Sequence, residues 1–335
     1  MPKRPTALFA FADRNLPLLF PPDVLTALRG LVDLDPTLTV ADFGDPRLAP
    51  VLPGVEVLIT GWGCPPVSAE VLDTLPRLHT LVHTAGTVKS LLAPEVWERG
   101  VAVSSAATAN ALPVAEYTLG MILLLGKGVF ALREEFRAQL RPPADLLHRD
   151  IGNVGRRVGI IGASRIGRRV IELLRPFEFE VLLHDPFVDE AAAARLGVRA
   201  VGLDELLASC SITSVHAPAT PATRHLIDAD RLALLPDGAT LINTARGSLV
   251  DTDALVRELT TGRINAVLDV TDPEPLPTTS ALFRLPNVFL TPHVAGSLGN
   301  ELRRLGLTAV HEIERVLRGE PLAHRVEAAE LSHSA

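Results

Sequence analysis

Cysteine is nearly absent from this sequence. Two of its 335 residues are cysteine, and Cys64 and Cys210 lie in unlike surroundings. Two such residues can build neither a disulfide framework nor a cysteine-based metal site. We therefore expect a protein of the reducing cytoplasm that has no metal centre.

Long hydrophobic runs are also lacking. No uninterrupted run approaches the ~18 apolar residues that a membrane span requires. The most apolar run, Met121 to Leu125, is short and lies near Glu116 and Lys127. At the start of the chain, Asp13 and Arg14 interrupt the apolar stretch too early for a secretory signal. We expect no membrane partner.

An excess of positive charge is missing as well. The formal net charge is −7, so the basic surface that binds nucleic acid is not expected. The composition is 47% hydrophobic and 21% charged, which is ordinary for a folded globular protein. At about 150 residues per domain, the length predicts two domains.

What is present is a recurring pattern of a short apolar, β-branched run, a turn and a helix-periodic stretch. Runs without strict alternation are typical of parallel strands that are buried on both faces. Repetition of the pattern predicts βαβ units and an α/β fold with doubly wound parallel sheets. The expected strands are Thr6–Ala10, Val55–Thr60, Thr80–His83, Val158–Ile161, Glu180–His184, Ile212–His216, Thr240–Asn243, Asn265–Val270 and Val288–Leu290.

Two longer helices are expected outside these units. One extends from about Ala111 to Leu140, with Asn110 as its cap and Pro142 and Pro143 ending it. The other extends over residues 299–318. We place a change of domain near the first helix.

A glycine-rich turn follows the strand at Val158. Its sequence matches G-x-G-x-x-G except that Ser164 replaces the middle glycine, between Gly162 and Gly167. In this motif the first glycine permits the tight turn, and the last lets helix and strand pack closely. The helix N-terminus then presents amide donors to a pyrophosphate. Ser164 either lengthens the backbone approach to the phosphates or donates its hydroxyl to one of them.

An acidic residue ends the next strand. Asp185 lies 23 residues after Gly162 (185 − 162), at the distance expected for an acceptor of the adenosine ribose hydroxyls. A carboxylate there would repel a 2′-phosphate, so the turn predicts NAD rather than NADP. The alternative is that Asp185 caps a helix before Pro186.

Further motifs lie downstream of the glycine-rich turn, and two looser ones lie upstream of it. In this order, they make residues 55–320 resemble the D-isomer-specific 2-hydroxyacid dehydrogenase family. The motifs are Ser214–Pro218 with Thr220–Arg224, Leu241–Gly247, Leu268–Val270 with Pro273–Pro275, Thr291–Gly296 and, more loosely, Thr84–Thr87 and Val114–Glu116.

The resemblance implies two Rossmann-like or flavodoxin-like doubly wound domains around a cleft. A discontinuous substrate-binding domain would comprise residues 1–108 and 299–335, and an NAD-binding Rossmann domain residues 109–298. The helix from about Ala111 to Leu140 would form the contact of a homodimer.

The resemblance also implies a catalytic trio. Arg246 would bind the substrate carboxylate as a bidentate fork and polarise the keto oxygen. His293 would be the general acid in reduction and the base in oxidation, and Glu274 would stabilise its protonated form. Taken singly, each could be an ordinary loop residue, but chance does not readily place all three just beyond predicted strands.

Further contacts carry over by position. Arg165 and Ile166 would lie under the pyrophosphate, and Asp269 would accept from the nicotinamide carboxamide. The backbone amides of Ala85 and Gly86 would hold the substrate carboxylate. Additional cofactor contacts are expected from Gly162, Ser164, Gly167, Asp185, Ala217, Thr244, Ala245, Arg246, His293, Gly296 and Thr87.

The sequence departs from the family members that use 3-phosphoglycerate. Where those members carry phosphate-binding arginines, this chain has Gly61 and Thr84. We therefore expect an unphosphorylated substrate. Trp62 would form a large apolar wall of the pocket, the alternative being that it is buried core. His83 is expected to pack in the core, and its spacing from His79 does not suit a metal pair on a strand.

These features predict an NAD-dependent oxidoreductase that acts on a small 2-oxo or D-2-hydroxy acid, resembling glyoxylate or hydroxypyruvate. A non-catalytic, corepressor-like NAD-sensing interaction protein is an alternative, because relatives of this fold act in that way. A methyltransferase with a similar glycine-rich turn is disfavoured by the downstream trio.

Overall fold

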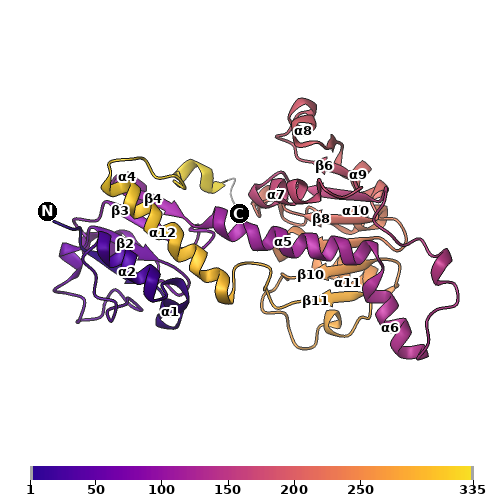
Figure 1. The fold of residues 1–335 in the computed structure, drawn as a ribbon, viewed down its shortest axis with the longest axis horizontal. Coiled ribbons are helices and arrows are strands. Elements are labelled where there is room, and N and C mark those ends of the chain that lie inside the picture. Colours follow the sequence, from indigo (N-terminus) through magenta and orange to yellow (C-terminus); the bar gives the residue numbers. More distant parts are fainter. Residues whose placement is uncertain (1–2, 333–335) are drawn as a thin grey trace. The chain divides into compact units, whose positions relative to one another are not determined.

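The chain folds into two compact units, each built on its own parallel β-sheet (Figure 1). The structure is a computed structural model in which residues 3–332 are described; the ends of the expected domain ranges, 1–2 and 333–335, lie outside them. Unit 1 comprises residues 3–111 and 297–332, and unit 2 comprises residues 112–296. The expected α/β class with two parallel sheets is confirmed.

Unit 1 contains a four-stranded sheet in the order β1-β2-β3-β4. Single parallel bridges from Thr6 to Asp33 and from Phe9 to Thr39 extend it on the other side of β1. After β1, the chain therefore first pairs with one edge of β1 and then crosses to the other edge, where β2 lies. Its elements are β1 (Ala7–Ala10), α1 (Leu16–Leu19), α2 (Pro22–Leu31), β2 (Val57–Thr60), α3 (Ala69–Asp73), β3 (Thr80–His83), α4 (Glu95–Glu98), β4 (Ala102–Ser105) and α12 (Leu302–Leu317).

Both faces of this sheet are buried, which explains why its strands lack alternation. Phe9 faces a cluster built with α1, α2 and α12, whereas Leu8 faces a second cluster built with α3 and α4. The helix α12 approaches α1 closely, because a Cβ on Gly306 would lie 1.8 Å from the carbonyl oxygen of Leu19. The C-terminal part of the chain is therefore part of this unit's core.

Unit 2 contains a seven-stranded parallel sheet in the order β11-β10-β9-β8-β5-β6-β7. The chain starts in the middle at β5, proceeds to β7 and then crosses to β8. The carboxyl ends of β5 and β8 therefore flank a topological switch point, where ligands bind in such sheets. Its elements are α6 (Val129–Gln139), β5 (Arg157–Ile161), α7 (Arg165–Leu174), β6 (Glu180–His184), α8 (Glu190–Leu196), β7 (Arg199–Ala200), α9 (Leu203–Ser209), β8 (Ile212–Val215), α10 (Ala229–Leu234), β9 (Thr240–Asn243), α11 (Thr252–Thr260), β10 (Asn265–Leu268) and β11 (Val288–Leu290).

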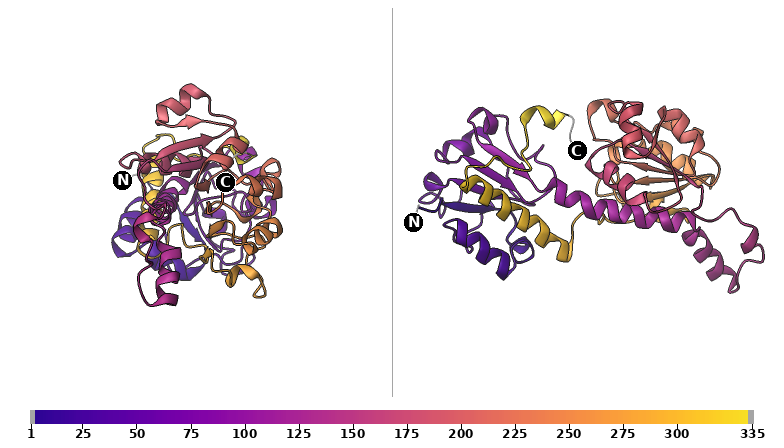
Figure 2. Two further views of the ribbon diagram at one scale, coloured as in Figure 1. Left: turned by 90° about the vertical axis from the view of Figure 1, so that its right-hand side faces the viewer. Right: turned by 45° about the horizontal axis from the view of Figure 1, so that its top comes forward.

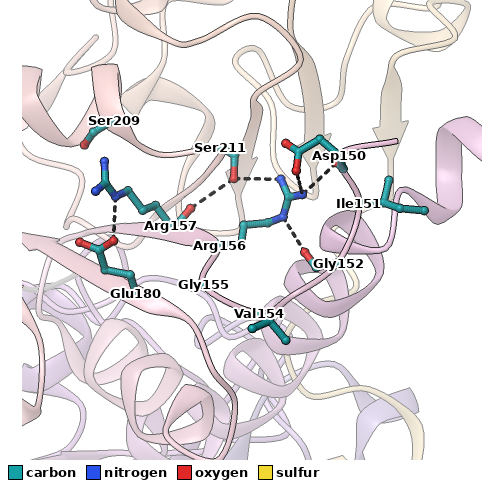
Figure 3. A pocket seen from close by; sticks show the side chains of 10 residues that line it. All are labelled: Asp150, Ile151, Gly152, Val154, Gly155, Arg156, Arg157, Glu180, Ser209 and Ser211. Atoms are coloured by element: carbon teal, nitrogen blue, oxygen red, sulfur yellow. Dashed lines mark hydrogen bonds and ion pairs between the residues drawn. The ribbon is translucent and has the colours of Figure 1, made fainter. Parts of the chain in front are cut away.

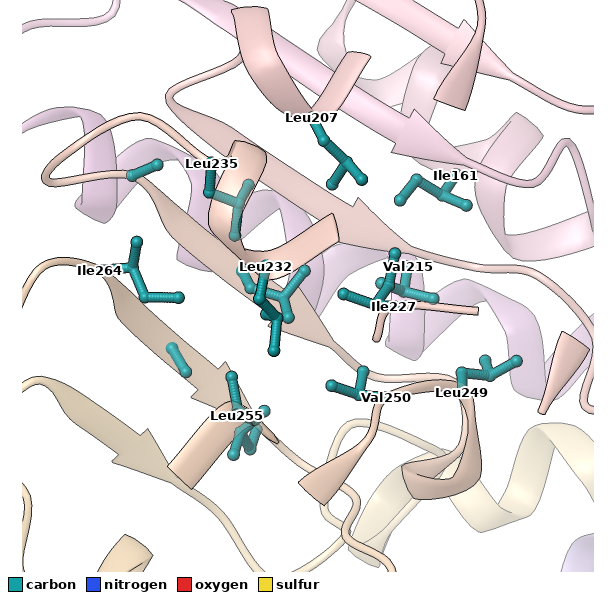
Figure 4. Close-up of a cluster of buried hydrophobic side chains, with 14 of the residues drawn as sticks. Ile161, Leu207, Val215, Ile227, Leu232, Leu235, Leu249, Val250, Leu255 and Ile264 are labelled. Atoms are coloured by element: carbon teal, nitrogen blue, oxygen red, sulfur yellow. The ribbon is translucent and has the colours of Figure 1, made fainter. Parts of the chain in front are cut away.

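Helices cover both faces of the second sheet. Figure 4 shows one of the two cores, in which Leu207, Leu232 and Leu255 from α9, α10 and α11 lie over Ile161 and Val215 of the sheet. The helix α7 covers the opposite face together with α5 (Ala107–Gly126), a helix that begins in unit 1 and continues in unit 2. Full burial of each large aliphatic side chain contributes about 1.5–3 kcal/mol.

The expected single helix over residues 111–140 is wrong. The helix α5 begins earlier, at Ala107, so Asn110 lies inside it and accepts a hydrogen bond from Ser297 N at 2.9 Å instead of capping it. The helix ends at Gly126, and Gly128 has a left-handed φ of +64° before α6 begins. A Cβ on Gly126 would lie 1.9 Å from the side-chain oxygen of Asn153. In Figures 1 and 2, α6 projects away from the rest of unit 2.

Two short strands were not predicted from the sequence pattern. The strand β4 ends in Ser104 and Ser105, which are both buried but interrupt the apolar run. The strand β7 has only two residues and its pairing with β6 is correspondingly brief. Neither run is long or apolar enough to be recognised from sequence alone.

One helix in the described chain is long and apolar enough to cross a membrane, judged by length and composition only. It is α5, whose apolar sequence is interrupted by Asn110 and Glu116. The core helix of a folded domain meets the same criteria. Ala115 and Ile122 of α5 are fully buried in unit 2.

Candidate active site

The glycine-rich turn begins where β5 ends. Gly162 has a φ of +96°, and a Cβ on it would lie 2.7 Å from the backbone nitrogen of Ala217. A Cβ on Gly167 would lie 2.0 Å from the carbonyl oxygen of Gly162. Both positions therefore require glycine, the first for its left-handed backbone and the second for the close packing of α7 on the turn.

Ser164, at the position of the motif's middle glycine, caps α7. Its Oγ accepts a hydrogen bond from Gly167 N at 3.3 Å. The hydroxyl proton is not used in this contact, so it can still be donated. Arg165 and Ile166 form the first turn of the helix, where backbone amides face the space beyond the carboxyl end of β5.

Asp185 links the end of β6 to the glycine-rich turn. Its Oδ2 accepts from Ala163 N at 2.7 Å and its Oδ1 from Phe187 N at 2.8 Å. The helix cap in this region is Asp189, at the start of α8, so the capping alternative for Asp185 is not seen. A carboxylate has about four acceptor positions, which leaves capacity for ribose hydroxyls.

Asn243 fixes the loop that carries Arg246. Its Nδ2 donates to the carbonyl oxygen of Arg246 at 2.8 Å, and its Oδ1 accepts from Ala245 N at 3.0 Å. Gly247 follows, and a Cβ there would lie 2.0 Å from the carbonyl carbon of Thr271. The loop after β9 therefore packs directly on the backbone of the loop after β10.

Arg246 lies largely buried at the end of this loop. Burial lowers the pKa of its guanidinium, and the charge of Glu274 acts in the opposite direction. One guanidinium nitrogen, Nη1, donates to the carbonyl oxygen of Ala245 at 2.6 Å. The remaining donors can bind an anion, and arginine stays charged in proteins.

His293 and Glu274 form a hydrogen-bonded pair. Nδ1 of the imidazole lies 2.6 Å from Oε1 of the carboxylate, and the two side chains are 50% and 43% exposed. The contact orients the ring and engages Nδ1. The other ring nitrogen, Nε2, is therefore the one that can exchange a proton with a ligand.

The loop of His293 is anchored by Asp269. The backbone N–H of His293 donates to the carbonyl oxygen of Asp269 at 3.0 Å. The buried Asp269 carboxylate accepts from Val294 N at 2.8 Å, from Ala295 N at 2.9 Å and from the Thr291 hydroxyl at 2.6 Å. These contacts hold His293 in a left-handed conformation, with a φ of +56° that costs about 1 kcal/mol for a residue with a Cβ.

The other expected cofactor residues of unit 2 lie at the same edge of its sheet. Ala217 follows β8, while Thr244 and Ala245 follow β9, and all three are buried. Gly296 is the last residue of the unit. The structure thus brings the trio and all expected cofactor residues except Thr87 into one unit.

The expected substrate residues, together with Thr87, lie in unit 1 after β2 and β3. Trp62 is 41% exposed, so the alternative that it is buried core is wrong. Ala85 is buried, whereas Gly86 and Thr87 are partly exposed. His83, at the end of β3, is buried as expected: its Nδ1 lies 2.9 Å from the Thr60 hydroxyl, and burial lowers its pKa to about 4.

Neither position discussed for a phosphate-binding arginine can present a cation. A Cβ on Gly61 would lie 2.6 Å from the hydroxyl oxygen of Thr84 and 3.3 Å from Cβ of Phe11. Thr84 is fully buried and donates to the carbonyl oxygen of Thr60 at 2.8 Å. Both the residue types and the side-chain packing therefore prevent a cationic side chain from extending from position 61 or 84.

A hollow of about 570 Å³ lies at the opposite edge of the unit 2 sheet, where strands begin (Figure 3). Its arginines already have protein partners: Arg157 donates to Glu180 at 2.8 Å, and Arg156 donates to the carbonyl oxygen of Gly152 at 2.7 Å. The hollow is far from the carboxyl ends of the strands and contains none of the expected residues. Within residues 3–332, no group of three or more potential metal ligands occurs.

Three supporting residues were not predicted from the sequence. Asn243 and Thr291 fall inside the motifs, but their sequence gives no sign of which backbone or side-chain groups they contact. Tyr117 lies on α5 and contacts Thr291, 174 positions away in the sequence. Contacts of this kind depend on the tertiary fold and leave no local signal.

Comparisons with known proteins agree with this arrangement. Residues 119–295 match the family model described as D-isomer specific 2-hydroxyacid dehydrogenase, NAD binding domain. A D-3-phosphoglycerate dehydrogenase of Mycobacterium tuberculosis is 35% identical over 255 residues, covering 76% of this chain and 48% of that protein. A glyoxylate reductase of Thermofilum pendens is 33% identical over 266 residues, covering 76% of each chain.

A solved structure extends the similarity to nearly the whole chain. A phosphoglycerate oxidoreductase from Rhizobium etli superposes with a TM-score of 0.80 at 25% identity, covering 97% of this chain and 99% of that one. The chain spans about half the length of the first curated relatives it matches. The family model covers more than half of the chain and coincides with the unit that holds the glycine-rich turn. The chain belongs to the D-isomer-specific 2-hydroxyacid dehydrogenase family, and unit 2 is its NAD-binding domain.

Proposed function

We propose that the protein is an NAD-dependent dehydrogenase that interconverts a small 2-oxo acid and its D-2-hydroxy acid. The observation that carries the proposal is the 2.6 Å contact between His293 Nδ1 and Glu274 Oε1. It lies in the same unit as the glycine-rich turn. An imidazole oriented by a carboxylate is well suited to general acid–base catalysis.

The residues of unit 2 fit a dinucleotide. The backbone of Gly162 and the start of α7 form a cradle that a Cβ would fill, and Asp185 lies where ribose hydroxyls would be accepted. NADH, when bound, supplies the hydride for the reduction. The protein's part is to bind, orient and exchange a proton.

His293 acts in this proposal through Nε2. Because Nδ1 is engaged with Glu274, the imidazole ring has one nitrogen left to face a substrate oxygen. During reduction, Nε2 gives its proton to the oxygen of the former carbonyl group, while Glu274 holds the ring through Nδ1. In the opposite direction, Nε2 takes the hydroxyl proton.

Arg246 binds the acid. Its planar guanidinium suits a carboxylate, and its burial strengthens the attraction because water screens the charges less. The backbone amides of Ala85 and Gly86 are proposed as further donors to the same carboxylate. Asp269 is proposed to accept from the nicotinamide carboxamide.

We expect His293→Ala to lower kcat/KM for 2-oxo acids about 10²- to 10⁴-fold, the usual contribution of a general acid. The variant should still bind NADH, because the glycine-rich turn and Asp185 are not altered. The measurement is NADH oxidation against a panel of 2-oxo acids, with NADH binding followed by fluorescence.

The control is His311→Ala, at an exposed position of α12, which should retain full activity. The proposal would be contradicted by a wild-type protein that binds NADH but turns over no member of the panel. That result would favour a non-catalytic, NAD-sensing interaction protein.

We further propose that the substrate is unphosphorylated. The buried contacts of Gly61 and Thr84 support this, since no cation can extend from either position. The exposed indole of Trp62 lies beside Gly61 and suits an apolar group. Some relatives bear the name phosphoglycerate dehydrogenase and others that of glyoxylate or hydroxypyruvate reductase. The names alone therefore do not tell whether the substrate is phosphorylated.

The comparison of two matched acids tests this point. We expect kcat/KM for 3-phosphohydroxypyruvate to be at least about tenfold below that for hydroxypyruvate, because the phosphate would lose its charge-assisted hydrogen bonds. The measurement is initial-rate kinetics with NADH in excess. Efficient turnover of the phosphorylated acid would overturn the proposal.

Asp185 is proposed to select NAD over NADP. We expect Asp185→Asn to lower the ratio of NADH to NADPH affinity at least about tenfold, because the amide keeps an acceptor oxygen but loses the charge that repels a 2′-phosphate. Asp189→Asn, at the cap of α8, is the matched control and should not change the ratio. Equal kcat/KM for NADH and NADPH in the wild type would refute this role.

We also propose a cytoplasmic homodimer, with a second copy of the chain covering α5, α6 and the loop after them. Arg149 ties that loop to α6 through Glu135 and pairs with Asp145 within the loop. Leu147 is 94% exposed and Leu140 86% exposed, an unfavourable state for large apolar groups. The other exposed apolar residues of this surface are Leu124, Val129, Phe136 and Val154.

Charge placed on this surface should separate the copies. We expect the double variant Leu140→Glu with Leu147→Glu to sediment as a monomer, and the wild type as a dimer. The control is Leu234→Glu, at an exposed leucine of α10 outside the surface. A wild type that sediments as a monomer at micromolar concentration would contradict the dimer.

A further inference from the structure

We propose that Tyr117 is a positioning residue for the reaction, and that its hydroxyl holds the loop of His293 in place through Thr291 and Asp269. The inference rests on the proposed function, in which His293 exchanges the proton. Tyr117 is the only tyrosine in the sequence. It lies on α5, and all four residues belong to unit 2.

The direction of the hydrogen bonds follows from the number of protons. The Thr291 hydroxyl donates to Asp269 Oδ1 at 2.6 Å, which uses its single proton. The oxygen of Tyr117 lies 2.8 Å from that of Thr291, so the phenol must be the donor in this contact. The chain of donors therefore starts at Tyr117 and ends on the Asp269 carboxylate.

The carboxylate at the end of this chain orders the loop of His293. Oδ1 also accepts from Val294 N and Oδ2 accepts from Ala295 N, the two amides that follow His293. A rotation of the carboxylate would break these bonds together. Because His293 itself has a left-handed backbone, the loop needs such fixed partners to keep its conformation.

The phenol is well suited to serve as the fixed point. Its ring packs against the core between α5 and the sheet, and burial raises the pKa of Tyr117, so the hydroxyl keeps its proton. Ala115 and Ile122 are fully buried on the same helix. The donor is thus carried by a long helix that is anchored in the core of unit 2.

The next residue of α5 contacts the other candidate loop. The Thr118 hydroxyl donates to the carbonyl oxygen of Val114 at 2.8 Å, and its oxygen lies 3.3 Å from the hydroxyl of Thr244. Thr244 lies two residues before Arg246. One turn of α5 therefore contacts both the loop of His293 and the loop of Arg246.

Four single variants test the positioning role. Removing the neutral hydrogen bond with Tyr117→Phe should lower kcat about 2- to 10-fold. Thr291→Val also removes the bond to a charged acceptor and should lower kcat about 10- to 100-fold, whereas Thr291→Ser should stay within about threefold of wild type. Thr260→Val, which removes an exposed hydroxyl from α11, should match wild type.

Two readouts separate positioning from a general loss of structure. All variants should still bind NADH, because Asp185 and the glycine-rich turn are distant along the sheet edge and are not altered. The double variant of Tyr117→Phe with Thr291→Val should be no slower than Thr291→Val alone, because the phenol acts only through that hydroxyl.

Hydrogen exchange gives a readout that needs no turnover. By mass spectrometry, the peptide around residues 290–298 should exchange faster in Tyr117→Phe and Thr291→Val than in Thr291→Ser, Thr260→Val or wild type. Unchanged exchange in both of the first two variants would overturn the inference, as would an unchanged kcat in an active enzyme. If the wild type turns over no 2-oxo acid, the proposed function fails. The exchange rates alone then show whether Tyr117 holds the loop of His293 in place.

Discussion

The buried carboxylate of Asp269 is the contact on which the candidate site depends most. It accepts three hydrogen bonds, and the residue's own carbonyl oxygen accepts a fourth from His293 N. Asp269 comes directly after β10, and its backbone N–H donates to the carbonyl oxygen of Asn243 at 3.0 Å. The end of β10 thus fixes the loop of His293, and it also contacts β9, the strand that leads to Arg246.

The site combines a rigid, buried support with partly exposed reactive groups. Asn243 and Gly247 fix the loop of Arg246 through backbone contacts that tolerate no larger side chain at the glycine. His293 and Glu274, by contrast, are about half exposed. Hydrogen-bonded groups at the base therefore set the geometry, while the imidazole and carboxylate remain accessible to a substrate.

Much of the fold could be predicted because buried parallel strands leave a strong pattern in sequence. Nine of the strands coincide with short apolar runs, while β4 escaped because Ser104 and Ser105 interrupt its run. The break between α5 and α6 was missed although Gly126 and the left-handed Gly128 mark it, because the apolar periodicity continues past them. The trio and the glycine-rich turn could be predicted from sequence motifs. The contacts of Thr291 could not, because its partners lie in distant segments of the chain.

The central claim is that Glu274 and His293 work as one acid–base pair. Its most direct test is stopped-flow measurement of NADH oxidation by Glu274→Gln, a variant that keeps the hydrogen bond to the ring but removes the charge. We expect unchanged NADH binding and a reduction step slowed about a hundredfold or more. A reduction step as fast as that of the wild type, with NADH bound equally well, would contradict it.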